Sequence, residues 1–466
     1  MSKHLLTVLA VALALAGCSS APPVKLYQPE LGGGFTNAPA GTAAEAPVGQ
    51  FWTAFHDPLL DSLVQRALTA NTDVRGAAAS LREVRALNRY ADANMLPSIG
   101  LNAGASRVRG INDLGVQSTN NNYAVGFDVA WEADLFGRLG DARRAAQANV
   151  LAGAAGVRAA QVSVSAEVAR NYFDLRGLQE QLRVAVDSLQ TQKAALELVD
   201  ARLEFGRGTA LDSERARALV SSTAANIPAL EAALIRTRYR LAVLCGLQPT
   251  ALDAELEPFQ PLPGLKSVAL AGIGSPADML RRRPDIQLAE AQAAAAAAQV
   301  GVARSALFPQ LTLGGTLGQN ALHISDLGKG ASYVYNLGAQ LTWNLIDFGR
   351  IRAQIAAADA RNDGVMINYE RAVLAALEET EGALATYTRT QRQTELLFDS
   401  ARSSEQAALI ARERFAVGST DFLTVLDAER ELLSARDRLA QAQAGAATSL
   451  VAVYKALAGG WEVPAE

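Results

Sequence analysis

The chain has 466 residues, of which 50% are hydrophobic, 19% charged and 6% aromatic. This composition excludes a disordered or collagen-like chain, and the formal net charge of −4 gives no support to a nucleic-acid partner. Much of the hydrophobic fraction is alanine, as in the run from Ala293 to Ala298, which favours long, closely packed helices over one thick globular core.

The first residues have the features of a bacterial lipoprotein signal peptide. Lys3 precedes an apolar run from Leu5 to Ala16, which is shorter than the ~20 residues a helix needs to cross a bilayer, and small residues precede Cys18. We expect residues 1–17 to be removed and Cys18 to carry covalent lipid. An ordinary secretory signal that contains a cysteine is the alternative. Ser19 follows the cysteine in place of an aspartate, which in lipoproteins indicates sorting to the outer membrane.

The rest of the chain consists of two copies of one structural unit. At one constant offset, identical residues of the two halves superimpose without a gap. The pairs include Asp73 with Asp285, Pro97 with Pro309, Trp131 with Trp343, Arg202 with Arg414 and Gly206 with Gly418. The predicted organisation is an irregular segment at 18–58, repeat 1 at 59–246, a Pro-rich joint at 247–275, repeat 2 at 276–460 and a tail at 461–466.

Each repeat is predicted to begin with a helix and a β-hairpin. The segment from Leu63 to Leu96 is rich in Ala, Arg and Leu, and we expect it to be helical up to Pro97, which cannot continue a helix. The hairpins follow at about 97–132 and 309–344. Large apolar residues alternate strictly with small or polar ones from Tyr123 to Glu132, as in a strand between an apolar and a wet surface.

These strands are predicted to face lipid. A sheet packed on a soluble core alternates in the same way, but the alternating runs here have about ten residues, the length of a tilted membrane strand. The aromatic residues near the strand ends resemble membrane-interface girdles; they are Tyr123, Trp131, Tyr333, Tyr335 and Trp343. Because four strands are too few to close a barrel, several chains must share one.

Long helical hairpins complete each repeat. No proline occurs from 138 to 204, and Leu and Val recur there at steps of three and four residues. This pattern predicts a coiled-coil-like helix about 100 Å long at ~1.5 Å per residue. A glycine turn leads to a second helix at about 209–245, in which we expect Pro228 to produce a kink. Repeat 2 is expected to have matching helices at about 350–416 and 419–458.

One family has the same ordered set of features: hairpins that begin at Pro97 and Pro309, Phe-Gly-Arg turns at 136–138 and 348–350, and duplicated glycine turns. The chain resembles the TolC-type outer-membrane efflux channels, in particular the NodT-like lipoprotein branch that serves resistance-nodulation-division (RND) pumps. The resemblance covers about 57–460. It implies an α+β membrane protein in which each chain of a homotrimer adds four strands to a shared twelve-stranded barrel and helices to a long periplasmic tunnel.

The resemblance also implies a function and partners. Such proteins passively conduct drugs or other small molecules across the outer membrane. Their partners are a periplasmic adaptor, an inner-membrane RND-type transporter and outer-membrane lipid, and Cys18 would be the acylated anchor.

The same resemblance implies roles for residues at the helical tips. The tips that meet the adaptor are Phe205, Gly206, Arg207, Val417, Gly418 and Ser419. Family members carry Val-Gly-Leu or Val-Gly-Thr there, a pattern from which Phe205 and the residues after the glycines depart. Acidic side chains beyond the second tip line the closed aperture in the family, so the gate candidates are Asp212, Arg414, Asp421 and Asp427. The alternatives are structural: Asp421 as a helix cap and Asp427 as a solvated charge.

The sequence contains no pattern for catalysis or a metal. His4, His56 and His323 lie far apart, and no second cysteine accompanies Cys245 once Cys18 is acylated. We therefore expect no enzyme activity, no metal site and no cofactor apart from the covalent lipid.

Two further patterns are expected to be structural. The run from Gly314 to Gly318 lies in a predicted strand and lacks the Lys-Ser/Thr of a phosphate loop. Glu378, Glu379 and Glu381 are predicted to form a solvated helix face, although paired carboxylates also serve as acid and base in enzymes.

Three other functions stay open on the sequence alone. A duct for type I protein secretion has the same architecture, but that branch commonly lacks the lipid. A structural envelope-spanning lipoprotein would have the helical stalk without a pore. A periplasmic hydrolase would need a buried pair of titrating carboxylates.

Overall fold

The computed structural model describes residues 21–39, 49–111, 115, 117–262 and 272–458. Cys18, the predicted signal peptide and the predicted tail lie outside the described residues. The chain divides into two units. Unit 1 comprises Met1–Gln28, Ser80–Ala154 and Leu288–Arg371, and unit 2 comprises Pro29–Ala79, Ala155–Gln287 and Ala372–Glu466.

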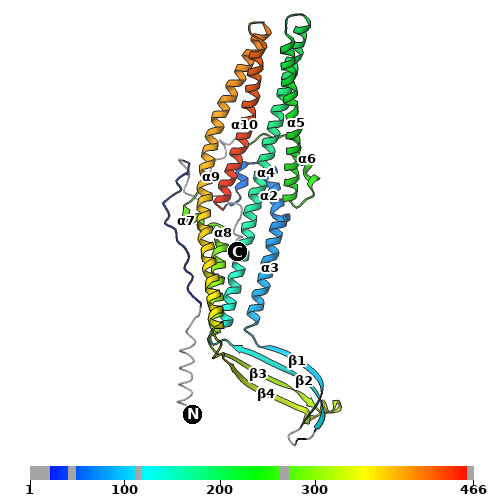
Figure 1. The fold of residues 1–466 in the computed structure, drawn as a ribbon, viewed down its shortest axis with the longest axis vertical. Helices are drawn as coiled ribbons and strands as arrows, with labels where there is room; N and C mark the ends of the chain where they lie inside the picture. The colour runs from blue at the N-terminus through cyan, green and yellow to red at the C-terminus, as the bar shows by residue number, and fades with distance from the viewer. Residues whose placement is uncertain (1–20, 40–48, 112–114, 116, 263–271, 459–466) are drawn as a thin grey trace. The chain divides into compact units, whose positions relative to one another are not determined.

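Unit 1 contains a four-stranded antiparallel β-sheet (Figure 1). Its strands lie in chain order: β1 (Ser98–Ile111), β2 (Gln117–Ala133), β3 (Gln310–Ala321) and β4 (Tyr333–Thr342). Two short 3₁₀ turns, η3 (Ile324–Asp326) and η4 (Gly330–Ser332), connect β3 to β4. Parts of four helices adjoin the strands, namely α3 (Thr72–Ala93), α4 (Arg138–Glu204), α8 (Pro284–Ser305) and α9 (Arg350–Ala416).

The register of the sheet separates an apolar face from a wet face. Leu101, Phe127, Leu317 and Tyr335 are paired in one row across all four strands, and all four side chains are exposed. The adjacent row, on the other face, consists of Gly100, Asp128, Thr316 and Asn336. Apolar and wet residues thus alternate where these two rows lie, whereas β1 departs from the alternation further along, where Arg107 and Arg109 lie on the same face as Leu101.

Glycine is required at one pair of facing positions on the wet face of β2 and β3. Gly126 and Gly318 are directly paired. A Cβ atom added to Gly318 would lie 2.5 Å from the carbonyl oxygen of Val125 and 2.7 Å from the Cα of Gly126. The two strands therefore approach each other more closely than any side chain permits.

Two tryptophans attach the sheet to the ends of the helices that precede it. The indole Nε1 of Trp131 donates to the carbonyl of Met95 at 2.9 Å, and that of Trp343 donates to the carbonyl of Leu307 at 3.0 Å. These are equivalent positions of the two repeats, so the duplication extends to side-chain contacts.

Unit 2 is helical. It contains α2 (Pro58–Ala70), α5 (Ala210–Leu244), α7 (Pro276–Arg282), α10 (Phe422–Ala456), parts of α3, α4, α8 and α9, and the short elements η1 (Phe51–Phe55), η2 (Pro249–Leu252) and α6 (Asp253–Leu256). The hairpins α4–α5 and α9–α10 lie side by side (Figure 1). Among the described residues, α5 is the one helix long and apolar enough to be a candidate for crossing a membrane, by length and composition only.

The helix predicted at the start of each repeat is two helices in the structure, divided in repeat 2 at Arg283 between α7 and α8. The helix expected from Leu63 to Leu96 is broken at Asn71, whose side chain donates to the carbonyl of Leu244 at 2.9 Å and accepts from the amide of Asp73 in the first turn of α3. Asn71 thus caps one helix and holds another. α5 is assigned as one helix through Pro228, and the kink expected there stays a prediction.

The segment before α2 packs aromatic side chains against α4 and α10 in unit 2. Phe51 stacks on Tyr454 of α10 with ring centroids 5.4 Å apart, and Phe55 contacts Phe173 of α4 at 4.6 Å. Arg176 of α4 is fully buried and donates to the carbonyl of Pro258 at 2.9 Å. These contacts fix the two irregular segments against the long helices.

Candidate functional site

The predicted tips are two matching turns in unit 2. Tip 1 (Phe205–Gly208) follows α4 and tip 2 (Val417–Thr420) follows α9. Gly206 and Gly418 both have positive φ, at 71° and 77°, which an L side chain rarely adopts. The amides of Arg207 and Ser419 each reach back to a carbonyl in the last helical turn, at 2.7 and 2.9 Å, as in a Schellman cap.

Both tips expose a large apolar side chain. Phe205 is 77% exposed and Val417 is 80% exposed, each directly before its glycine. Arg207 and Ser419, which follow the glycines, are also exposed. Each tip thus presents one exposed apolar side chain beside a glycine turn.

The four gate candidates do not form one cluster within the chain. The Asp421 carboxylate accepts from the amide and the hydroxyl of Thr424 at the start of α10, and these bonds hold the pKa of Asp421 below its usual value. Asp212 accepts from the hydroxyl of Thr209, which caps α5. Asp427 and Arg414 are exposed, and none of the ion pairs among the described residues joins two of the four.

An arginine that sequence analysis had not selected joins the two hairpins near their tips. Arg202 Nη2 donates to the carbonyls of Phe415 and Ala416 at 2.8 and 2.9 Å, and its guanidinium lies 4.1 Å from the centre of the Phe415 ring. The signal that could have identified Arg202 in the sequence was its equivalence to Arg414 of the second repeat, which was selected as a gate candidate. The hydrophobic cluster beside this contact contains Val199, Ala216, Leu219, Ala411, Phe422, Val425 and Leu426.

Each hairpin is also closed by an ion pair at equivalent positions. In repeat 1, Asp200 of α4 faces Arg217 of α5 at 3.7 Å. In repeat 2, Arg412 of α9 faces Glu429 of α10 at 2.6 Å, so the polarity is reversed. Burial raises the pKa of Glu429, and Arg412 opposes the shift.

The prediction of a solvated glutamate face on α9 is wrong for two of its three members. Glu379 accepts from Arg283 Nη2 at 2.7 Å and from Lys455 Nζ at 3.0 Å. Glu381 accepts from the amide of Thr36 at 2.7 Å and from the Asn37 side chain at 2.8 Å. Burial raises the pKa of each glutamate, but the hydrogen bonds outweigh burial and hold both below their usual value. Their partners lie far away in sequence, so local pattern did not reveal them.

The predicted interface aromatics lie on the sheet or beside it. Tyr123 and Trp131 are in β2, Tyr333 and Tyr335 are in β4, and Trp343 follows β4 directly. Because β2 begins at Gln117, Tyr123 lies inside that strand. It is paired with Ala321, the last residue of β3, two residues beyond the last pair of β3 with β4, and therefore marks the level at which the three-stranded part of the sheet ends.

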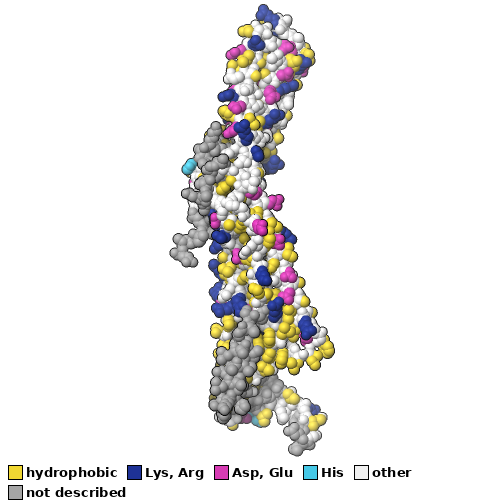
Figure 2. All heavy atoms as spheres, turned by 90° about the vertical axis from the view of Figure 1, so that its left-hand side faces the viewer, with side chains coloured by type: hydrophobic (Ala, Val, Ile, Leu, Met, Phe, Trp, Pro, Cys, Tyr) yellow, Lys and Arg dark blue, Asp and Glu magenta, His cyan; other side chains and the backbone are white. Residues whose placement is uncertain are grey.

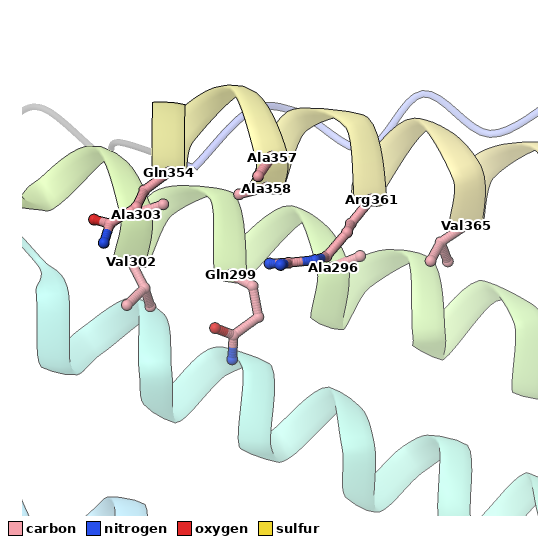
Figure 3. A pocket seen from close by; sticks show the side chains of 9 residues that line it. All are labelled: Ala296, Gln299, Val302, Ala303, Gln354, Ala357, Ala358, Arg361 and Val365. Carbon is pink, nitrogen blue, oxygen red and sulfur yellow. The ribbon is translucent and has the colours of Figure 1, made fainter. Parts of the chain in front are cut away.

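A groove in unit 1 lies between α8 and α9. It has a volume of about 500 Å³ and is lined mainly by alanine, glutamine and valine. Figure 3 shows Arg361 extending from α9 towards Ala296 of α8. Arg361 is the one ionisable residue in the lining, so the groove contains no acid–base pair. Among the described residues, no group of three or more His, Cys, Asp and Glu side chains is placed to hold a metal ion.

Charges of both signs are dispersed over the helical surface. On the face drawn in Figure 2, Lys and Arg side chains alternate with Asp and Glu side chains. Many of these charges form pairs along one helix, such as Arg183 with Glu180 and Asp187. This is the surface of helices that are in contact with water.

Comparison with known proteins gives consistent results over nearly the whole chain. Residues 63–247 and 276–459 match the family described as outer membrane efflux protein. The chain is 32% identical to the pyoverdine export outer membrane protein OpmQ of Pseudomonas aeruginosa, over 99% of this chain and 98% of OpmQ. It is 30% identical, with the same coverage, to the toluene efflux pump outer membrane protein TtgF of Pseudomonas putida.

A solved structure has the same fold. The outer-membrane channel OprN superimposes with a TM-score of 0.90 at 35% identity, covering 95% of this chain and 100% of that chain. The predicted α+β channel fold and the outer-membrane location are thereby confirmed. The family model matches both repeats, and the chain is 32% identical to a relative over 98% of the relative's length. The chain therefore belongs to the outer membrane efflux protein family.

Proposed function

We propose that three copies of this outer-membrane protein form the passive outer duct of a tripartite efflux pump. The observation that carries the proposal is the open sheet. Its edges are β1 and β4, and among the described residues neither edge pairs with a further strand. Backbone groups left unpaired in lipid are too costly to persist, so the edges need neighbours. Pairing β4 of one copy with β1 of the next closes a barrel of twelve strands, above the minimum of ~8.

The two faces of the sheet support a water-filled pore. The apolar row of Leu101, Phe127, Leu317 and Tyr335 suits lipid, whereas the wet row presents glycine, threonine, asparagine and Asp128. Small wet-face residues leave room for a solute. Relatives are named for pyoverdine export and toluene efflux, and we take drugs or other small molecules as the cargo of this duct.

The duct itself supplies no energy in this proposal and performs no chemical step. An inner-membrane RND-type transporter drives transport, and a periplasmic adaptor docks on tip 1 and tip 2. The exposed Phe205 and Val417 side chains support that docking. Asp427 of the three copies would line the closed aperture, and its exposure on α10 suits a ring of carboxylates that binds cations. Lipid on Cys18 would add a second attachment to the outer membrane.

Subunit mass and stoichiometry of detergent-extracted protein from an outer-membrane fraction test the proposal, with Cys18→Ala as the control. We expect a trimer whose subunits carry lipid mass that the control lacks. A water-soluble monomer would refute the shared barrel.

Single-channel recording in a planar bilayer tests conduction. A trimer that never conducts would favour a structural lipoprotein. A deletion strain with unchanged sensitivity to every dye, detergent and drug, but with a lost secreted protein, would favour type I secretion.

A further inference from the structure

We propose that Arg414 binds tip 1 of a neighbouring copy, by the same contact that Arg202 makes with tip 2 inside one chain. The inference rests on the proposed trimer. It names a specific residue pair at the seam between copies: the Arg414 guanidinium as donor and the carbonyls of Leu203 and Glu204 as acceptors.

The contact inside the chain defines the geometry. Arg202 donates to the carbonyls of Phe415 and Ala416, which belong to the last turn of α9. Carbonyls in the last turn of a helix lack intrahelical partners, and a cation is favourable there because of the helix dipole. Arg202 therefore caps α9 from the neighbouring hairpin.

The contact runs in one direction only. The repeat-mates of Arg202, Phe415 and Ala416 are Arg414, Leu203 and Glu204. If a twofold axis related the repeats, Arg414 would donate to Leu203 and Glu204 within the same chain. Instead, Arg414 is exposed, and its guanidinium has no hydrogen bond or ion pair with any described residue.

The acceptor side of tip 1 likewise receives no arginine from any described residue. The Leu203 carbonyl accepts from the amide of Gly206 at 3.0 Å, just as the Phe415 carbonyl accepts from Gly418 at 2.9 Å, but only the Phe415 carbonyl also receives an arginine. Both tips have the same positive-φ glycine and the same backbone cap, so they present their carbonyls alike.

A head-to-tail interface of this kind leaves one donor side and one acceptor side free at its ends. Such interfaces generate a ring when the rotation closes. Within the described part of one chain, the donor without a partner is Arg414, and the tip that receives no arginine is tip 1. The donor of one copy therefore matches the acceptor of another copy. In a ring of three chains, Arg414 of one copy therefore meets Leu203 and Glu204 of the next.

The two kinds of seam differ in strength. Inside the chain, Arg202 stacks on the Phe415 ring and Phe422 packs in the adjoining cluster. Between copies the stacking partner is Leu203, and the position of Phe422 is taken by Ala210. The seam between copies thus has the same hydrogen bonds as the seam inside the chain and lacks the aromatic ring.

Thiol cross-linking tests the contact with a matched control. In a Cys245→Ala background, one variant carries Arg202→Cys with Ala416→Cys and the other carries Arg414→Cys with Glu204→Cys. The first variant is used to choose a bifunctional maleimide long enough to bridge the known contact. Cross-linking of this variant should join two positions of the same chain, which raises the mass of the single chain by that of the linker. The second pair should, with the same reagent, give covalently linked dimers and trimers on a denaturing gel. Arg414 and Glu204 are exposed, and the trimer mass of each variant before treatment verifies folding.

The outcomes separate this inference from the proposed function. Linked copies from the second pair support the inference. A trimer mass with linkage in the first pair and none between copies in the second overturns it, while leaving the shared duct intact. A monomer mass for the unmodified protein overturns both.

Discussion

Arginine in place of Leu337 should block assembly in the membrane, whereas arginine at the adjacent Asn336 should be tolerated. Leu337 lies on the apolar face of β4 opposite Gly315, with 83% of its surface exposed in the single chain. Asn336 lies on the wet face opposite Thr316. The proposed faces thus place two adjacent residues of β4 in different surroundings, Leu337 in lipid and Asn336 in water.

The expected magnitude follows from the position of Leu337 in β4. It is the fifth residue of the strand, about 14 Å from Tyr333 at ~3.4 Å per residue. With a strand tilt of about 40°, that is about 10 Å along the membrane normal, close to the middle of an apolar band ~25 Å tall. Arginine there costs about 2–4 kcal/mol per chain, or about 6–12 kcal/mol for three chains, and only about 0–1 kcal/mol at the interface.

Denaturant titration in lipid vesicles, followed by tryptophan fluorescence, measures this difference. Leu337→Arg should lower the unfolding free energy by that amount, while Asn336→Arg and Tyr333→Arg should stay within about 1 kcal/mol of the parent protein. Equal losses at Leu337 and Asn336 would refute the face assignment. Equal losses at Leu337 and Tyr333 would refute the depth argument and with it the position of the girdle.

Three more predictions concern packing and charge. Gly318→Ala should destabilise the sheet by about 1–3 kcal/mol, because its Cβ would lie 2.5 Å from the Val125 carbonyl oxygen. The control is Gly104→Ala, whose Cβ would meet nothing within 4 Å. The heat resistance of the trimer on gels compares the two variants, and equal resistance would contradict the close approach of β2 and β3. Arg283→Met should lower the free energy of unfolding, measured by chemical denaturation, by about 2–3 kcal/mol. This is less than the loss expected for a fully buried ion pair, because the Glu379 side chain is still 36% exposed. An unchanged stability would mean that the ion pair with Lys455 alone is enough to stabilise the Glu379 carboxylate. The pKa of Glu379 is held below its usual 4.5, so the contribution of this carboxylate to the free energy of unfolding is complete above pH 4.5 and is lost as the pH falls through the lowered pKa. Glu379→Gln should therefore flatten the acid limb of a curve of stability against pH. An unchanged limb would show that other carboxylates dominate.

Much of the fold could be predicted because its signals are local. Alternation over Tyr123 to Glu132 assigned the two faces of β2, and the Phe-Gly-Arg turn at 136–138 and the glycine turn at Gly206 gave the bounds of α4. Glycine at 206 and 418 gave the turns, since positive φ there requires it. Each of these signals depends on a few neighbouring residues, which a single sequence displays directly.

The remainder depends on contacts between distant residues. The break at Asn71 follows from a hydrogen bond to Leu244, and the same break in repeat 2 is marked in the sequence only by Pro284, whose counterpart in repeat 1 is Thr72. The role of Glu381 depends on amides of Thr36 and Asn37, far away in the chain. The roles of Asn71 and Glu381 therefore depend on partners that the local sequence pattern does not display.

The reversed ion pairs have a consequence for how two nearly equal hairpins fold in one chain. If α4 associated with α10 in place of α5, Asp200 would face Glu429, and if α9 associated with α5, Arg412 would face Arg217. Both exchanged pairings bring like charges together, whereas both correct pairings bring opposite charges together. The polarity of one ion pair thus identifies the repeat to which each helix belongs, and a chain with the same polarity in both repeats would lose that protection against exchanged helices during folding.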